Sequence, residues 1–197
     1  MKHRFLLLTL LLTGTARAES ITNLPGLVIH GGTNKYVEAS GQTATTDDIL
    51  EFIAVETGGR DYESLFTLDC RPSAMKFALL LIGCDTNSPV RIEVEWQGKR
   101  RPVEEFLIDR QTKKSPGALP WIFTGSYFNQ DPISGKEVFR ADEEQAFIAL
   151  WPQPAVLVNL TKDFGNPYRG GDQGFEANAK LLPAKGTPVK LIVRRRE

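Results

Sequence analysis

The chain has 197 residues, with 24 Lys and Arg against 24 Asp and Glu, and it contains two His and two Cys. This length fits a single domain with its own hydrophobic core, and the balanced charge gives no electrostatic reason to expect binding to nucleic acid or to an anionic membrane surface. His3 lies in the first eighteen residues and leaves His30 for the remainder, which excludes a zinc site built from two or three histidines.

Residues 1–18 have the pattern of a secretory signal peptide. A basic start is followed by an apolar run at 5–12 and by a small-x-small cleavage site that ends at Ala18. The apolar run is too short for a membrane span, which needs about 20 residues. We therefore expect a secreted protein, periplasmic or extracellular, with residues 19–197 as one domain and no membrane span after cleavage.

Short strands are predicted along most of this domain. The segment 90–96 alternates between apolar and polar residues, which is typical of a strand with one face in water. The others are short apolar runs bounded by residues that favour turns, such as Gly, Pro, Asn and Asp. The predicted strands are 27–30, 36–39, 49–55, 64–68, 90–96, 121–128, 138–141, 146–150, 155–160 and 189–193.

One helix is predicted at about 72–82. Pro72 suits the first helical position, and Gly83 suits the left-handed residue that follows a last turn. Residues 79–82 are consecutive and apolar, so we expect this helix to be apolar nearly all round and buried on more than one side. Residues 103–109 fit either a second short helix or a strand.

The expected fold class is α+β, a mainly antiparallel β-sheet with one buried helix at about 72–82 and room for a second short helix. A long irregular loop is expected at about 161–179, and we name this segment the late loop. Long structureless segments are uncommon in compact domains and are often functional when they occur.

The late loop is the predicted binding site. Its carboxylates and amides alternate with glycines, a combination that suits calcium, although turns use the same residue types. Asp163, Asp172 and Glu176 are a weak calcium candidate set. The predicted binding residues are Asp163, Asn166, Arg169, Asp172 and Glu176.

Ser73 and Lys76 match the S-x-x-K motif at the start of the predicted helix. In penicillin-binding proteins and β-lactamases this motif supplies a serine nucleophile with a lysine one turn later, on the same helix face. The two companion motifs are imperfect, because 126–129 is one residue too long for S-x-N and 185–187 has K-T-G in altered order. In the simpler interpretation Ser73 starts the helix and Lys76 is solvated.

Cys70 and Cys84 flank the predicted helix. A helix of this length would separate them by roughly 20 Å, whereas a disulfide needs Cα atoms within about 7 Å. We therefore expect two buried free thiols, and a disulfide would require a shorter or bent helix. In a third interpretation the N-terminus of the helix stabilises a reactive Cys70 thiolate.

Four stretches carry a family resemblance. They are Gly-Leu-Val-Ile at 26–29, Glu-Ser-Leu-Phe at 63–66, Pro-Ser at 72–73 leading into 78–83, and Trp-Ile-Phe-Thr-Gly-Ser at 121–126. In their order and spacing they resemble the YdjY-domain family of exported bacterial proteins, over roughly residues 24–160. The resemblance implies an exported domain and carries no catalytic residue over to this chain. Some members are joined to ferredoxin-like, cysteine-rich segments, which this chain lacks.

These observations favour a non-enzymatic binding or accessory protein of the cell envelope, with no cofactor. Its partner would be an envelope protein or a small ligand, bound at the late loop or on an aromatic platform of Trp121, Trp151 and Tyr127. The alternatives are a serine hydrolase or acyl-transfer enzyme that uses Ser73 and Lys76, and thiol or metal chemistry at Cys70.

Overall fold

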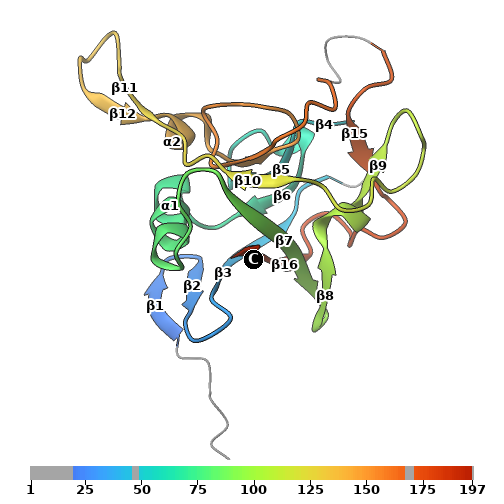
Figure 1. The fold of residues 1–197 in the computed structure, drawn as a ribbon. Helices are drawn as coiled ribbons and strands as arrows, with labels where there is room; N and C mark the ends of the chain where they lie inside the picture. The colour runs from blue at the N-terminus through green and yellow to red at the C-terminus, as the bar shows by residue number, and fades with distance from the viewer. Residues whose placement is uncertain (1–19, 46–48, 167–170, 197) are drawn as a thin grey trace, which may run out of the picture.

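The computed structural model describes residues 20–45, 49–166 and 171–196. Within these ranges the chain is dominated by β-strands, with two short α-helices outside the main sheet (Figure 1). The predicted signal peptide at 1–18 lies outside the described residues. No helix of the described ranges is long and apolar enough to cross a membrane.

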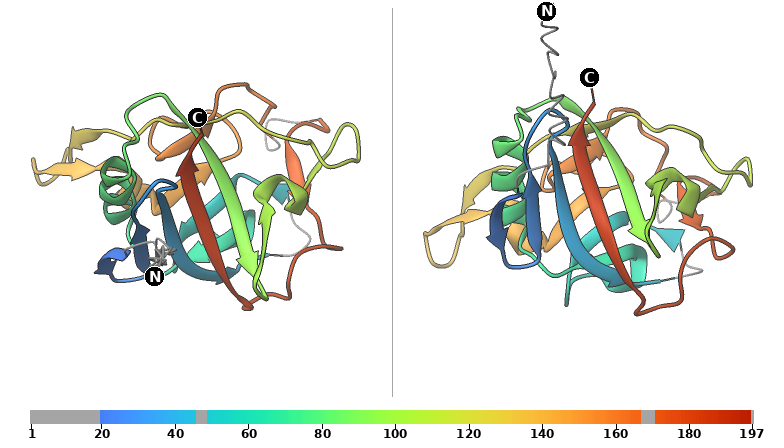
Figure 2. Two further views of the ribbon diagram at one scale, coloured as in Figure 1. Left: turned by 60° about the horizontal axis from the view of Figure 1, so that its bottom comes forward. Right: turned by 90° about the horizontal axis from the view of Figure 1, so that it is seen from below.

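Eight strands close into a barrel, in the order β3-β16-β7-β10-β14-β13-β5-β6, with β6 pairing back to β3. The pairs β5–β6 and β13–β14 are parallel, and the other neighbouring pairs are antiparallel. Figure 2 shows β3, β16 and β7 side by side as the long wall of the barrel. The barrel strands are β3 (Tyr36–Thr43), β5 (Phe52–Glu56), β6 (Ser64–Leu68), β7 (Ser88–Trp96), β10 (Trp121–Phe123), β13 (Ala146–Ala149), β14 (Val158–Leu160) and β16 (Pro188–Arg195).

The barrel closes at Gly41, in the middle of β3. The first half of β3 pairs with β2 (Leu27–His30), and the second half pairs with β6. A Cβ atom on Gly41 would lie 2.1 Å from the carbonyl oxygen of Thr67 on β6. Closure therefore requires a residue without a side chain at this position.

The remaining elements flank the barrel. The strand β1 (Ser20–Leu24) pairs with β2, and β8 (Lys99–Pro102) pairs with β7. A three-stranded sheet and a two-stranded hairpin stand apart from the barrel. The sheet contains β4 (Ile49–Leu50), β15 (Phe175–Ala177) and β9 (Leu107–Asp109), and the hairpin contains β11 (Phe128–Gln130) and β12 (Glu137–Phe139). The two α-helices are α1 (Pro72–Leu81) and α2 (Arg140–Glu144). Short 3₁₀ turns cover Asp61–Glu63 and Val103–Phe106.

Buried apolar side chains from nearly every barrel strand form one large cluster, which also includes residues of α1 and of the 3₁₀ turn at 103–106. Six phenylalanines are among the largest fully buried side chains of the described residues. These are Phe52, Phe66, Phe106, Phe123, Phe147 and Phe175. The core is therefore formed mainly by strands, and α1 packs against it with one face.

The expected α+β fold with a buried helix is wrong. The helix α1 occupies the predicted residues, but it packs on the outside of the barrel through Pro72, Met75, Ala78 and Leu79. Phe77, Leu80 and Leu81 are 52%, 48% and 44% exposed. An apolar helix sequence is compatible with burial on several faces. The number of faces that are buried depends on which strands pack against the helix.

Smaller expectations also need correction. Residues 103–109 form neither one helix nor one strand, because a 3₁₀ turn at 103–106 leads directly into β9. A short helix, α2, occupies 140–144 and replaces the end of the strand that was expected at 138–141. The late loop is not irregular throughout, because it contains β15, which pairs with both β4 and β9.

Candidate functional site

One described part of the late loop, residues 171–179, is fastened to Arg110, directly after β9, and the other part is fastened to the first. The guanidinium of Arg110 donates hydrogen bonds to the carbonyl oxygens of Gln173 (2.9 Å) and Gly171 (3.3 Å). The backbone N–H of Gly174 donates to the carbonyl oxygen of Phe164 at 3.0 Å. These bonds bring the two described parts of the late loop together beside the end of β9.

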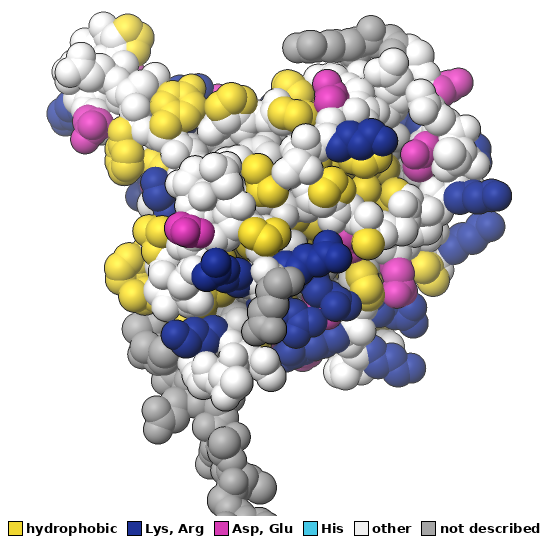
Figure 3. Space-filling view, in the orientation of Figure 1, with side chains coloured by type: hydrophobic (Ala, Val, Ile, Leu, Met, Phe, Trp, Pro, Cys, Tyr) yellow, Lys and Arg dark blue, Asp and Glu magenta, His cyan; other side chains and the backbone are white. Residues whose placement is uncertain are grey.

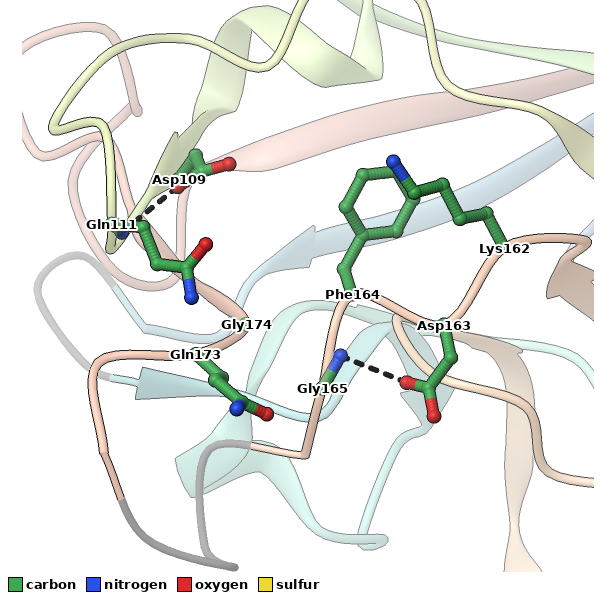
Figure 4. A pocket seen from close by; sticks show the side chains of 8 residues that line it. All are labelled: Asp109, Gln111, Lys162, Asp163, Phe164, Gly165, Gln173 and Gly174. Carbon is green, nitrogen blue, oxygen red and sulfur yellow. Dashed lines mark hydrogen bonds between the residues drawn. The ribbon is translucent and has the colours of Figure 1, made fainter.

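A pocket of about 330 Å³ lies where these segments meet. In Figure 4 the amide side chains of Gln111 and Gln173 lie on one side of it, and Lys162, Asp163 and Phe164 lie on the other. Its volume is at the lower end of the range for small-molecule sites, which is about 300–1,000 Å³. The lining residues are Asp109, Gln111, Lys162, Asp163, Phe164, Gly165, Gln173 and Gly174.

The two carboxylates of the pocket shape its loops. Asp109 Oδ1 accepts hydrogen bonds from the backbone N–H groups of Gln111 (2.8 Å) and Thr112 (2.9 Å). Asp163 Oδ1 accepts one from the backbone N–H of Gly165 at 2.8 Å. Side-chain oxygens that bind the backbone two residues later form tight Asx turns. One oxygen of each carboxylate is therefore committed to holding the wall of the pocket.

An aromatic ring forms the apolar part of the wall. Phe164 packs against the buried Phe175 with 5.3 Å between ring centroids, and Lys162 Nζ lies 5.0 Å from the centroid of Phe164. Gly165 has a φ of +87°, and a Cβ atom there would lie 2.1 Å from Gln173 Oε1. Glycine thus permits both the turn and the close approach of Gln173.

The structure disperses most of the predicted binding residues. Asp163 lines the pocket, but Asn166 donates towards Glu51 Oε1 at 3.5 Å. The side chain of Asp172 is 82% exposed, and Glu176 lies 3.5 Å from Lys113 Nζ. Arg169 lies outside the described residues. The lining residues Gln111, Phe164 and Gln173 were missed, because single glutamines and phenylalanines carry no local signal and the loop pairing is long-range.

The calcium candidate set is not assembled. Asp163 binds the backbone of its own turn, Asp172 lies 3.9 Å from Arg110, and Glu176 pairs with Lys113. Among residues 20–45, 49–166 and 171–196, no group of three or more His, Cys, Asp or Glu side chains is placed to hold a metal ion. The three carboxylates therefore serve separate local contacts.

Ser73 and Lys76 both lie on α1, but each makes its contacts with other residues. The backbone N–H of Ser73 donates to Asp142 Oδ1 at 2.8 Å, which fastens the start of α1 to α2. Lys76 Nζ lies 4.6 Å from the ring centroid of Phe139 and 5.4 Å from that of Phe128. Desolvation by burial lowers the pKa of Lys76, but the amine is occupied by these two rings rather than by the serine.

Cys70 and Cys84 are free and buried, as expected from the length of the helix. Burial raises the pKa of Cys70 to about 12, and the negative charges of Glu56 and Asp69 add to the effect. Burial likewise raises the pKa of Cys84 to about 11. A thiol with such a pKa stays protonated near neutral pH, so this environment does not favour a reactive thiolate at Cys70.

The predicted aromatic platform of Trp121, Trp151 and Tyr127 is not assembled on the surface, because Trp121 is buried. Trp121 is 2% exposed, and its indole N–H donates to Glu104 Oε1 at 3.0 Å. Tyr127 is 45% exposed. Trp121 therefore belongs to the core, and the platform as predicted is wrong.

Comparison with known proteins adds no further assignment. No family model matches the sequence, no curated protein matches it, and no solved structure matches the fold. The resemblance to the YdjY-domain family stays a prediction based on the stretches quoted above.

Proposed function

We propose that this protein is an exported, non-enzymatic binding protein of the cell envelope, and that its late-loop pocket holds a small neutral saccharide. The observation that carries the proposal is the lining of the pocket. Two amide side chains, two carboxylates, one ammonium group and one aromatic ring converge on a single cavity of about 330 Å³.

The chemistry of this lining matches hydroxyl groups. A hydroxyl both donates and accepts hydrogen bonds, and the side-chain amides of Gln111 and Gln173 do the same. Asp109 and Asp163 supply acceptors, and Lys162 supplies a donor. Because charges of both signs are present, the pocket favours an uncharged polar ligand over a strongly charged one.

The apolar part of the lining suits the same ligand class. The C–H face of a sugar ring can pack on an aromatic side chain, and Phe164 is held in place by Phe175 behind it. The predicted signal peptide and the YdjY-domain resemblance support a location at the envelope, where glycans are abundant. Ser73 is bonded through its backbone to Asp142, Lys76 lies against aromatic rings, and the Cys70 thiol is protonated, and these observations give less support to the enzymatic alternatives.

The test is a titration of the exported protein with a panel of neutral mono- and disaccharides, followed by NMR or calorimetry. We expect saturable binding of at least one sugar, and we expect Gln111→Ala and Gln173→Ala each to weaken it roughly tenfold, the effect of one lost hydrogen bond. The matched controls are Gln42→Ala and Gln130→Ala, which change exposed glutamines outside the pocket. Absence of saturable binding, or equal effects of all four variants, would refute the proposal.

A further inference from the structure

Five basic side chains gather at one end of the barrel, although the whole chain is balanced in charge. They line a cleft of about 740 Å³ where β7 begins and β16 ends, beside the turn after β2. The cleft is lined by Thr33, Asn34, Lys35, Ile82, Pro89, Arg91, Arg194, Arg195 and Arg196. The overall charge balance, used above to argue against an anionic surface, conceals this local excess.

The pairing of β7 with β16 concentrates the charge at a cost. Arg91 and Arg194 are direct partners across the two strands, and like charges placed directly opposite destabilise a sheet. Both reach the same buried carboxylate, since Glu93 Oε1 lies 3.3 Å from Arg91 Nε and 3.2 Å from Arg194 Nη2. One carboxylate thus forms ion pairs with two guanidinium groups.

The other three basic groups are still less neutralised. Arg195 donates to the carbonyl oxygen of Gly83 at 3.1 Å, and it is a minor cause of the lowered pKa of the nearby Asp85. Within the described part of the chain, the side chains of Lys35 and Arg196 have no ion pair. The cleft therefore carries a net positive charge.

An apolar stripe adjoins this cleft. Phe77, Leu80 and Leu81 are spaced i, i+3 and i+4 along α1, so they share one face of the helix, and each is about half exposed. Ile82, directly after α1, lines the cleft. In Figure 3 hydrophobic side chains lie over α1, and Lys and Arg side chains gather beside the end of that helix.

We propose that this face, the α1 stripe together with the basic cleft, docks the protein on the surface of an anionic lipid membrane. Apolar side chains that enter the boundary between headgroups and acyl chains, next to basic groups that bind anionic headgroups, are the combination by which peripheral proteins bind membranes. Nucleic acid would use the basic cleft but would leave the apolar stripe without a role.

The test is co-sedimentation of the exported protein with lipid vesicles. We expect binding to vesicles that contain phosphatidylglycerol, little binding to vesicles of phosphatidylcholine alone, and weaker binding as the salt concentration rises. The double variant Lys35→Ser with Arg196→Ser should lower the vesicle affinity at least roughly tenfold. Its control, Lys114→Ser with Lys180→Ser, removes the same charge from exposed positions outside the cleft.

A second pair of variants tests the apolar stripe. Phe77→Ser with Leu81→Ser should lower vesicle affinity at least roughly fivefold, whereas Tyr62→Ser with Leu181→Ser, which removes exposed apolar groups elsewhere, should not. Circular dichroism checks the folding of each variant, and the single variants Lys35→Ser and Leu81→Ser replace any double variant that unfolds.

Three results would overturn the proposal. The first is no preference for anionic vesicles, and the second is equal effects of the variants and their controls. The third is binding of inorganic phosphate or of a short DNA duplex that depends on Lys35 and Arg196 while vesicles do not bind, which would assign the cleft to a soluble anion or to nucleic acid. The variant Gln173→Ala should bind vesicles normally, so this test is independent of the saccharide proposal.

Discussion

Arg60 and Glu144, 84 residues apart in sequence, lie together with 3.2 Å between Arg60 Nη2 and Glu144 Oε2. Arg60 Nη1 is 3.4 Å from both Glu51 Oε2 and Glu63 Oε1, whose side chains are nearly buried. The guanidinium also lies 4.4 Å from the ring centroid of Phe52. The guanidinium of Arg60 thus links carboxylates that lie just before β5, just before β6 and on α2.

Replacing this cation should destabilise the fold. The variant Arg60→Met removes a positive charge that lies beside the nearly buried carboxylate of Glu51, and we expect the free energy of unfolding to fall by about 2–4 kcal/mol, somewhat less than for a fully buried pair because Arg60 is a third exposed. The control is Arg71→Met, because the side chain of Arg71 is 69% exposed and should contribute less than about 0.5 kcal/mol. Urea denaturation measures both, and similar losses for the two variants would contradict this account.

Glu104 should be essential to the packing of Trp121. Glu104 Oε1 accepts hydrogen bonds from the Trp121 indole N–H (3.0 Å) and from the backbone N–H of Leu119 (3.1 Å). We expect Glu104→Ala to cost about 1–3 kcal/mol, because two donors lose their acceptor. Glu104→Gln keeps an acceptor oxygen and should cost less. Glu105→Ala removes a half-exposed ion pair with Arg101 and serves as the control in the same denaturation experiment.

The elements that were predicted well are those with local signals. The short apolar runs at 27–30 and 64–68, which neighbour turn residues, predicted β2 and β6 with the observed bounds, and Pro72 marked the start of α1. The barrel closure was missed because it depends on the pairing of β3 with β6, and Gly41 gives no local sign of it. Burial of α1 was overestimated because its composition does not show what covers it.

The candidate pocket lies in the segment that was predicted to bind a ligand, but most of its lining residues differ from the predicted ones. The glycines and acidic residues of the late loop identified the segment, and Asp163 lines the pocket found there. Gln111 was missed because it lies on the distant segment after β9 and reaches the pocket only through tertiary pairing. Phe164 was missed because a lone aromatic residue is as consistent with the core as with a binding site.

Gly41 should not tolerate a side chain. A Cβ atom there would lie 2.1 Å from the carbonyl oxygen of Thr67 and 2.9 Å from Leu68 Cδ2, so β3 and β6 would have to separate. We expect Gly41→Val to destabilise the protein by at least about 3 kcal/mol, the upper end of ordinary overpacking costs. The neighbouring Gln42→Val, at an exposed position of the same strand, should change stability little. A stable, cooperatively unfolding Gly41→Val protein would show that the closure at Gly41 is incorrect.

The buried thiols should react slowly while the protein is folded. Because burial raises the pKa values of Cys70 and Cys84 to about 12 and about 11, little thiolate is present at pH 8. We expect alkylation by iodoacetamide to be at least about 100-fold slower in the folded protein than in urea. Mass spectrometry identifies which cysteine is modified. Rapid labelling of Cys70 in the folded protein would contradict a buried, protonated thiol and would support the reactive-thiolate hypothesis.

The raised pKa of Cys70 makes the free energy of unfolding depend on pH in the alkaline range. The folded protein keeps the Cys70 proton up to a pKa of about 12, whereas the ordinary thiol loses it at about 9.0. The folded state therefore binds more protons between these values, so this contribution to stability is complete below pH 9 and is lost as the pH rises towards 12. Other groups titrate in the same window, so the comparison is with Cys70→Ala. That variant should lose less stability between pH 8 and pH 11 than the unmodified chain does, and parallel losses in the two proteins would contradict the assignment.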